Sequence, residues 1–252
     1  MSFEFTGRRV WVTGASRGLG RAIALGFAAS GADVALTARS AEALAEVSAE
    51  AEGLGAKTLV LPASVSDADA VTGAVAEIER SWGGLDVLVN CAGVSPSFKK
   101  AELVEDGEWR LVMDVNVTGS FLCAREAGKL MLEHEHGAIV NVSSIHGQVG
   151  GERMAAYSAS KGAVDALTRT LALEWATRGV RVNTISPGYF ETDMTEALRG
   201  HKKWRGHLLQ RIPLGRFGVP QELVSAALFL ASDASGFMTG SNVVVDGGWT
   251  AA

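Results

Sequence analysis

Cysteine is scarce in this sequence, with Cys91 and Cys123 the only two among 252 residues. They fall at the end of a segment predicted to be a buried strand and within a predicted helix. We therefore interpret them as packed thiols rather than as a disulfide. Packed thiols are typical of a reducing compartment, and we expect the protein in the cytoplasm.

Long apolar runs and basic runs are also missing. No stretch of about 18 uncharged apolar residues occurs, and Met1–Arg9 carries no apolar segment of signal-peptide length, so we expect no membrane association. The net charge is −5, and basic residues occur singly or in pairs such as Lys202 and Lys203. This pattern excludes a continuous basic surface for nucleic acid.

What the sequence does contain is an alternation of short apolar runs with segments of helical spacing, which is typical of a parallel sheet covered on both faces. The predicted strands are Arg9–Thr13, Asp33–Ala38, Lys57–Leu61, Leu85–Asn90, Ala138–Ser143, Val180–Ser186 and Asn242–Val245. The predicted helices include Leu19–Ser30, Ala41–Glu52, Asp67–Trp82, Trp109–Glu133, Ala155–Arg178 and Gln221–Ala231.

With right-handed crossovers, these elements predict one α/β domain over residues 1–252, a Rossmann fold with a doubly wound, seven-stranded parallel sheet and helices on both faces. No repeat, low-complexity segment or linker marks a domain boundary. The crossover before the last strand is longer than the others and carries a charged segment. We expect it to form a substrate lid at about residues 188–215.

A glycine-rich turn, Thr13 to Gly20, follows the first predicted strand and opens the first predicted helix. Glycines there let the backbone approach a pyrophosphate at the helix N-terminus, although glycines also serve ordinary tight turns. The spacing is Gly-x3-Gly-x-Gly, with Gly14, Gly18 and Gly20. The turn therefore predicts a dinucleotide site.

The end of the second predicted strand indicates which dinucleotide binds. Enzymes that use NAD place an Asp or Glu there for the adenosine ribose, whereas this chain has neutral residues followed by Arg39. Arg39 and Arg17 could both bind a 2′-phosphate, which favours NADP(H) over NAD(H). The alternative is that both arginines are solvated surface residues.

Tyr157 and Lys161 lie one helical turn apart, so their side chains share a helix face. A phenol with an ordinary pKa of about 10 is a poor acid or base at neutral pH, and a nearby cation lowers that pKa. On its own a Tyr-x3-Lys pair is common and usually marks a solvated helix face. Its meaning here depends on the other motifs.

Those motifs occur in order over nearly the whole chain. They are Thr13–Gly20, Asn90-Cys91-Ala92-Gly93, Val142-Ser143-Ser144, Tyr157 with Lys161, and Pro187-Gly188 followed by Thr192. In this the chain resembles the short-chain dehydrogenase/reductase family, the tyrosine-dependent oxidoreductases. Segments Pro187–Met194, Phe229–Ser235 and Asp246–Gly248 are similar to the branch that holds gluconate 5-dehydrogenase and 3-oxoacyl-acyl-carrier-protein reductases.

The resemblance implies a role for each matching residue. The catalytic residues would be Asn116, Ser144, Tyr157 and Lys161, with Tyr157 as acid or base, Ser144 on the substrate oxygen and Asn116 holding a water in a proton path. Asn116 could equally be a satisfied polar residue at a helix kink. Cofactor contacts would be Gly14, Ser16, Arg17, Gly18, Leu19, Gly20, Arg39, Val65, Asn90, Ala92, Gly93, Tyr157, Lys161, Pro187, Gly188 and Thr192. The family's usual Asp before Val65 is replaced by Ser64, which weakens any assignment to Ser64. No metal is expected.

Substrate identity lies in loops that vary between relatives. We expect the pocket to include Ser95, His146, Gln148, Tyr189, Met194 and Trp204. His146 could instead be an ordinary loop histidine, and Trp204 a core or interface residue. The expected substrate is a small ketone, keto acid, polyol or sugar acid. The alternatives are a 3-oxoacyl-acyl-carrier-protein reductase and, remotely, a catalytically silent NADP-binding regulator.

Self-association is also expected. The predicted helices Trp109–Glu133 and Ala155–Arg178 are too apolar to be half exposed, and in the family the equivalent helices pack against copies of themselves. We therefore expect a homotetramer.

Overall fold

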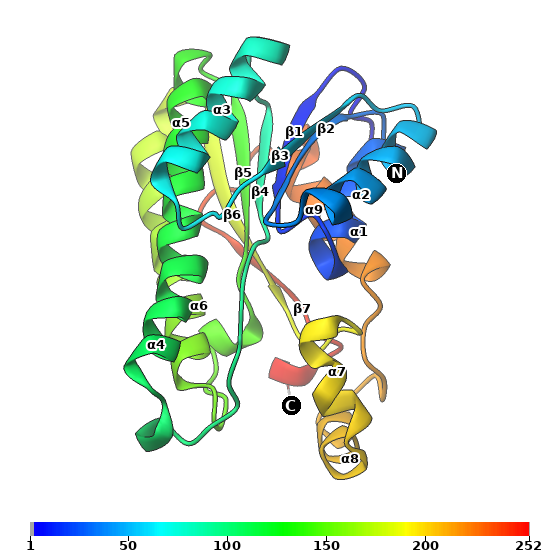
Figure 1. The fold of residues 1–252 in the computed structure, drawn as a ribbon, viewed down its shortest axis with the longest axis vertical. Helices are drawn as coiled ribbons and strands as arrows, with labels where there is room; N and C mark the ends of the chain where they lie inside the picture. Colours follow the sequence, from blue (N-terminus) through cyan, green and yellow to red (C-terminus); the bar gives the residue numbers. More distant parts are fainter. Residues whose placement is uncertain (1–2, 252) are drawn as a thin grey trace.

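The computed structural model describes residues 3–251 and contains one seven-stranded sheet (Figure 1). The strand order is β3-β2-β1-β4-β5-β6-β7, and every pairing is parallel. The strands are β1 (Arg9–Thr13), β2 (Asp33–Ala38), β3 (Thr58–Pro62), β4 (Val87–Asn90), β5 (Gly137–Val142), β6 (Val180–Pro187) and β7 (Asn242–Val245). This confirms the predicted doubly wound parallel sheet. The strand order reverses between β1 and β4, which is where open α/β sheets bind their ligands.

Three helices cover each face of the sheet (Figure 1). On one face lie α1 (Gly18–Ala29), α2 (Ala41–Gly53) and α9 (Gln221–Ala231), and on the other α3 (Ala68–Trp82), α5 (Gly119–Glu133) and α6 (Ala155–Trp175). Side chains of β1 alternate between the two cores, with Val10 and Val12 in the first and Trp11 in the second. The central strands are therefore buried on both faces, whereas the edge strands β3 and β7 are partly exposed.

The predicted helix Trp109–Glu133 is interrupted in the structure. Helix α4 (Asp106–Met113) begins three residues earlier than predicted, at a capping box formed by Glu105 and Glu108. A π-helical turn, Asp114–Thr118, then separates α4 from α5. Such turns are frequent at functional sites, and this one carries Asn116.

The segment between β6 and α9 carries two short helices, α7 (Asp193–Gly200) and α8 (Lys202–Gln210). Its ends are joined, because Phe190 and Gly218 form a parallel bridge and the amide of Glu191 donates to the carbonyl of Gly218. The two helices lie away from the main helical layers, near the C-terminus of the chain (Figure 1). We call residues 190–218 the lid segment.

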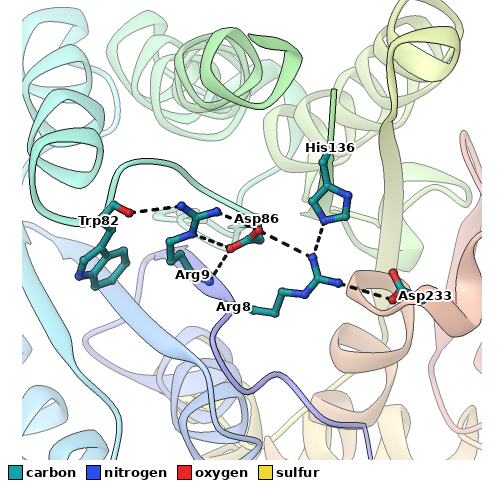
Figure 2. A network of polar contacts seen from close by, with 6 residues as sticks. All are labelled: Arg8, Arg9, Trp82, Asp86, His136 and Asp233. Atoms are coloured by element: carbon teal, nitrogen blue, oxygen red, sulfur yellow. Dashed lines mark hydrogen bonds and ion pairs between the residues drawn. The ribbon is translucent and has the colours of Figure 1, made fainter. Parts of the chain in front are cut away.

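An ionic network ties the amino ends of the strands together (Figure 2). Asp86, just before β4, receives hydrogen bonds from the Arg9 amide and Nε at 2.8 Å each and from Arg9 Nη2 at 3.1 Å. Arg8 lies between Asp86, Asp233 and His136. The network borders a cavity of about 280 Å³ at the edge opposite the strand ends that carry the glycine-rich turn.

Buried polar side chains also connect neighbouring strands. Asn90 on β4 donates to Asn141 Oδ1 on β5 at 3.0 Å, and Asn141 donates to Thr168 Oγ1 on α6 at 2.8 Å. Thr184 on β6 donates to the same Thr168 oxygen at 2.9 Å. We call Asn90, Asn141, Thr168 and Thr184 the polar ladder. All four are at most 3% exposed.

Within residues 3–251, no helix has the length and apolar character needed to cross a membrane.

Candidate active site

The glycine-rich turn brings bare backbone to the N-terminus of α1. Gly14 has a φ of +67°, and a Cβ there would lie 2.8 Å from the Cα of Ala92, while a Cβ on Gly20 would lie 2.2 Å from the Gly14 carbonyl oxygen. Helix α1 has no side-chain cap and no acidic residue in its first turn. Its free amides and positive dipole end therefore face the turn, which fits the pyrophosphate of a dinucleotide.

The turn is held against the residues that follow β4. Thr13 Oγ1 accepts hydrogen bonds from the amides of Cys91 and Ala92 at 3.1 and 3.2 Å. Asn90 donates to the carbonyl of Ser120 at 3.1 Å as well as to the polar ladder. The residues predicted to meet the cofactor on β1 and β4 thus form one rigid floor.

The two arginines predicted to bind a 2′-phosphate differ in their surroundings. Arg17 pairs with Asp193 at the start of α7, with 3.2 Å between Nη1 and Oδ2, so it links the glycine-rich turn to the lid segment. Arg39 is exposed just after β2 and has no ion pair within residues 3–251. Ser16 and Leu19 belong to the turn and to the first residues of α1.

Val65 lies between the adenine side of the predicted site and α5. It is 7% exposed, and a Cβ on Gly119 would lie 2.6 Å from Val65 Cγ2, so glycine at 119 allows the close approach. The neighbouring Ser64 hydroxyl is 2.9 Å from that of Ser66 and is thus engaged locally.

Tyr157, Lys161 and Ser144 meet beyond this floor. Tyr157 and Lys161 share a face of α6, with Lys161 Nζ 5.7 Å from the centre of the phenol ring. Ser144 follows β5, is 5% exposed and lies close enough to Tyr157 for its hydroxyl to favour the phenolate, against the larger effect of burial. Lys161 Nζ donates to the carbonyl of Val142 at 2.8 Å, which fixes its position.

Burial dominates the ionisation of this pair. It raises the pKa of Tyr157, and it lowers the pKa of Lys161 to about 8, because both charged forms lose hydration. The sequence predicted that Lys161 would lower the pKa of Tyr157, whereas in the structure burial raises that pKa and the contribution that opposes the rise comes from Ser144. A phenol held neutral is suited to donate a proton.

Asn116 lies fully buried in the π-helical turn. Its Oδ1 accepts from the amide of Val94 at 2.8 Å, and its Nδ2 donates to the Val94 carbonyl and to Ser160 Oγ at 3.0 Å each. A Cβ on Gly93 would lie 3.4 Å from Asn116 Oδ1 and 3.5 Å from Lys161 Nζ. Asn116 therefore holds the loop after β4 beside Lys161.

The residues predicted to meet the nicotinamide follow β6. The Gly188 amide donates to the carbonyl of Val245 at 2.9 Å, and a Cβ on Gly188 would lie 2.7 Å from the Cα of Asp246. Pro187 ends β6, and Thr192 is the N-cap of α7. The Thr192 methyl group faces Gly18, so this segment borders the glycine-rich turn.

Two of the predicted pocket residues form a hydrogen-bonded pair. His146 Nε2 lies 3.0 Å from Tyr189 Oη, and burial lowers the pKa of His146 and raises that of Tyr189 to about 12. The Tyr189 ring also packs on Trp249, with 4.9 Å between ring centres. Trp249 was missed in the sequence because it lies 60 residues from Tyr189 and carries no motif.

The remaining predicted pocket residues are spread around this pair. Trp204 on α8 contacts Phe98 edge to face at 5.2 Å, and the guanidinium of Arg153 lies over both rings. Ser95 borders a small cavity with Tyr157. Gln148 donates to Ser186 at 3.3 Å, and Met194 on α7 is 49% exposed.

Comparison with known proteins places this geometry in a family. A family model described as "Enoyl-(Acyl carrier protein) reductase" matches residues 14–250. The chain is 42% identical to gluconate 5-dehydrogenase of Gluconobacter oxydans, covering 98% of this chain and 96% of that protein. This protein belongs to the short-chain dehydrogenase/reductase family. Members of the family are NAD(P)-dependent enzymes acting on CH–OH groups, and so is this one.

Other relatives show the range of substrates for which similar proteins are named. Galactitol 2-dehydrogenase (L-tagatose-forming) of Cereibacter sphaeroides is 44% identical, covering 98% of this chain and 97% of that protein. A 3-oxoacyl-[acyl-carrier-protein] reductase of Synechocystis is 41% identical, with 94% of each chain covered. The crystal structure of a gluconate 5-dehydrogenase from Burkholderia cenocepacia in complex with NADP and tartrate has a TM-score of 0.96 at 35% identity, covering 100% of this chain and 98% of that one.

Proposed function

We propose that this protein is an NADP(H)-dependent carbonyl reductase or alcohol dehydrogenase that interconverts a ketone and a secondary alcohol on a small polyol or sugar acid. The observation that carries the proposal is the meeting of Tyr157, Lys161 and Ser144 beside the glycine-rich turn. This arrangement places a proton donor, a buried cation and a hydroxyl next to the glycine-rich turn that would bind the dinucleotide.

The bound nicotinamide supplies or accepts the hydride. In reduction, Ser144 donates a hydrogen bond to the substrate oxygen, and Tyr157 transfers its phenolic proton to that oxygen as negative charge develops. In oxidation Tyr157 accepts the proton. Lys161, fixed by the Val142 carbonyl, holds positive charge beside the phenol and would bind the nicotinamide ribose, while Asn116 keeps the Val94 loop in place.

The preference for NADP rests on Arg39. A guanidinium at the end of β2 with no carboxylate beside it suits a 2′-phosphate. Arg17 would approach the same phosphate only by leaving Asp193 or by binding both. The Burkholderia relative was crystallised with NADP, which supports the same cofactor here.

The substrate class rests on the relatives and on the pocket. Gluconate 5-dehydrogenase and galactitol 2-dehydrogenase are named for a sugar acid and a polyol, and the Burkholderia structure holds tartrate. In this chain the His146–Tyr189 pair offers hydrogen bonds beside Ser144, as a polyhydroxylated substrate requires. We place the enzyme in the cytoplasm, because Cys91 and Cys123 are free thiols.

The second candidate is reduction of a 3-oxoacyl group on acyl-carrier protein, favoured by the Synechocystis relative. An acidic carrier would need cations near the pocket entrance. Lys99 pairs with Glu108 at 2.9 Å, and Arg125 and Lys129 both pair with Glu126 at 2.7 Å. These three cations share two carboxylates and together retain only about one positive charge, which is little for binding an acidic carrier and favours a small substrate.

The test measures the absorbance of NADPH at about 340 nm. Its formation is followed with polyols and aldonates, and its consumption with small ketones, keto acids and acetoacetyl thioesters. We expect turnover of polyols or sugar acids, with NADP(H) preferred. In the Tyr157→Phe variant, turnover should fall at least about a thousandfold, because the proton donor is lost. NADPH should still bind, because the glycine-rich turn is unchanged.

Turnover of the thioesters alone would assign the carrier-protein reaction instead. NADPH binding without any turnover would favour the silent-regulator alternative. Turnover retained in Tyr157→Phe would disprove the mechanism. Ser158→Ala, one residue along on α6, is the matched control and should keep its turnover.

A further inference from the structure

The wall of the pocket continues from the catalytic serine to the C-terminal segment. His146, two residues after Ser144, meets Tyr189 at 3.0 Å, and Tyr189 packs on Trp249. Trp249 is 4% exposed and belongs to a small core with Ile145, Leu208, Ile212 and Phe217, which joins the lid segment to the catalytic loop. These contacts make one continuous wall of largely buried side chains.

Arg211, which is exposed, ends that wall. It is the C-cap of α8, and its guanidinium carbon lies 4.1 Å from the centre of the Trp249 ring. Stacking on an indole fixes the plane of the guanidinium and leaves its N–H edge for hydrogen bonds. Within residues 3–251 no carboxylate pairs with Arg211, whereas Arg216, five residues further on, is bound by both oxygens of Glu222.

The Arg211 charge is also felt at the pocket. Burial is the main cause that lowers the pKa of His146, and the Arg211 charge lowers it further. For Tyr189, the Arg211 charge opposes burial, which raises the pKa. Burial thus keeps His146 neutral, and Arg211 is the positive charge on this wall.

We propose that Arg211, held on the Trp249 ring at the end of the His146–Tyr189 wall, binds the carboxylate of the substrate. This inference rests on the proposed function and narrows it to sugar acids, because a planar guanidinium edge matches a carboxylate with two parallel hydrogen bonds. The carboxylate at one end of the substrate then sets which carbon faces Tyr157. Arg211 is a specificity-determining residue rather than part of the proton transfer.

The experiment compares six-carbon aldonates with the hexitols that match them, using the wild-type protein and the Arg211→Gln variant with NADP. We expect the wild-type protein to favour aldonates. In Arg211→Gln the KM for aldonates should rise about 10- to 100-fold, as expected for loss of a charge-assisted pair. Its kcat/KM for hexitols should stay within about twofold, because a neutral terminus does not use the charge.

Two further variants separate specificity from structure. Arg205→Gln removes an exposed charge from the same helix and should leave the ratio of aldonate to hexitol kcat/KM unchanged. Arg211→Lys keeps the charge without the planar fork and should recover part of the lost aldonate affinity. A purely structural role for Arg211 predicts instead an equal loss on both substrate classes.

An equal loss, or no loss on aldonates, overturns the assignment of Arg211. Wild-type turnover of hexitols without aldonates overturns it too, while the proposed polyol oxidation stands. If the wild-type protein oxidises neither class and reduces none of the matching ketones, the proposed function fails, and the assignment of Arg211 fails with it.

Discussion

At the scale of single residues, the site depends on side chains whose charged forms are poorly hydrated. Burial raises the pKa of Tyr157, lowers that of Lys161 to about 8 and raises that of Cys91 to about 11. The neutral forms of the phenol and the thiol are thus favoured at neutral pH. Cys91, although next to the cofactor floor, is a poor nucleophile there.

Arg39 provides a prediction at this scale. In Arg39→Asp, a carboxylate would repel a 2′-phosphate and accept a hydrogen bond from an unphosphorylated ribose. We expect the ratio of kcat/KM for NADP to that for NAD to fall by at least about tenfold, measured with one substrate. Arg178→Asp makes the same charge change on an exposed turn after α6 and should leave the ratio as it was. An unchanged ratio in Arg39→Asp would remove the phosphate assignment.

The sequence predicted the main site residues from local patterns. Tyr157 and Lys161 were recognisable from their spacing, and Ser144 from its place after β5. Contacts between distant segments were not recognisable. The pairing of Arg17 with Asp193 and the stacking of Arg211 on Trp249 depend on where the lid segment folds, and no local pattern encodes that.

At the scale of elements, the ionic network in Figure 2 joins β1 to β4. Burial of Asp86 opposes ionisation, but its hydrogen bonds from Arg9 and the charges of Arg9 and Arg8 lower its pKa overall. Its contribution to stability is therefore complete above the unfolded-state pKa of about 3.9, and it is lost as pH falls through the lower folded-state pKa.

Asp86→Asn should accordingly lower the free energy of unfolding by about 2 kcal/mol at pH 7, measured by urea denaturation. The loss of stability on acidification below about pH 4 should be smaller in the variant than in the wild-type protein. Asp233→Asn breaks only an exposed 3.5 Å pair with Arg8 and should change stability by less than about 0.5 kcal/mol. Equal effects of the two substitutions would contradict the proposed role of Asp86.

Helices and strands with a strong apolar periodicity were predicted well, whereas elements with a weak periodicity were not. The strands and α1, α2, α3 and α9 lie within a few residues of their predicted positions. Helices α7 and α8 are short and polar, and only Leu208 among their residues is buried, so periodicity had little to detect. The π-helical turn arises from a local change in hydrogen bonding that leaves the spacing of apolar residues almost unaltered.

At the scale of the whole molecule, apolar side chains remain exposed on the outer helices and near the last strand. They include Trp109, Leu111, Phe121, Leu173, Phe237 and Val244. Leu173 is 83% exposed on α6, and Phe237 is fully exposed between α9 and β7. Such surfaces favour contacts with further copies of the chain, and we propose a homotetramer.

Native mass spectrometry should find a tetramer for the wild-type protein. Leu173→Glu places a charge on the exposed side of α6, and Phe237→Glu places one between α9 and β7. Each should shift the population toward dimers, because a charge at a packed apolar contact is costly. Leu54→Glu, at the exposed end of α2, is the control and should remain tetrameric. A monomeric wild-type protein at micromolar concentration would rule the assembly out.

The fold as a whole was predictable because alternating apolar strands and helices permit few arrangements. Positions such as Val10, Trp11 and Val12, apolar without interruption, indicate a strand buried on both faces. For the order of the strands in the sheet, the sequence offered only the general rule of right-handed crossovers. The polar ladder was not predicted, and of its four residues the sequence singled out only Asn90, as a cofactor contact.

The polar ladder also bears on how the chain finds its native pairing. Strands made of valine and isoleucine would tolerate a slipped alignment, since one aliphatic side chain can replace another. A slip would separate Asn90 from Asn141 and Thr168 from Thr184, leaving amide and hydroxyl groups in a dry interior without partners. The ladder therefore favours the native register, because a misaligned sheet would bury unpaired polar groups that apolar packing alone does not penalise.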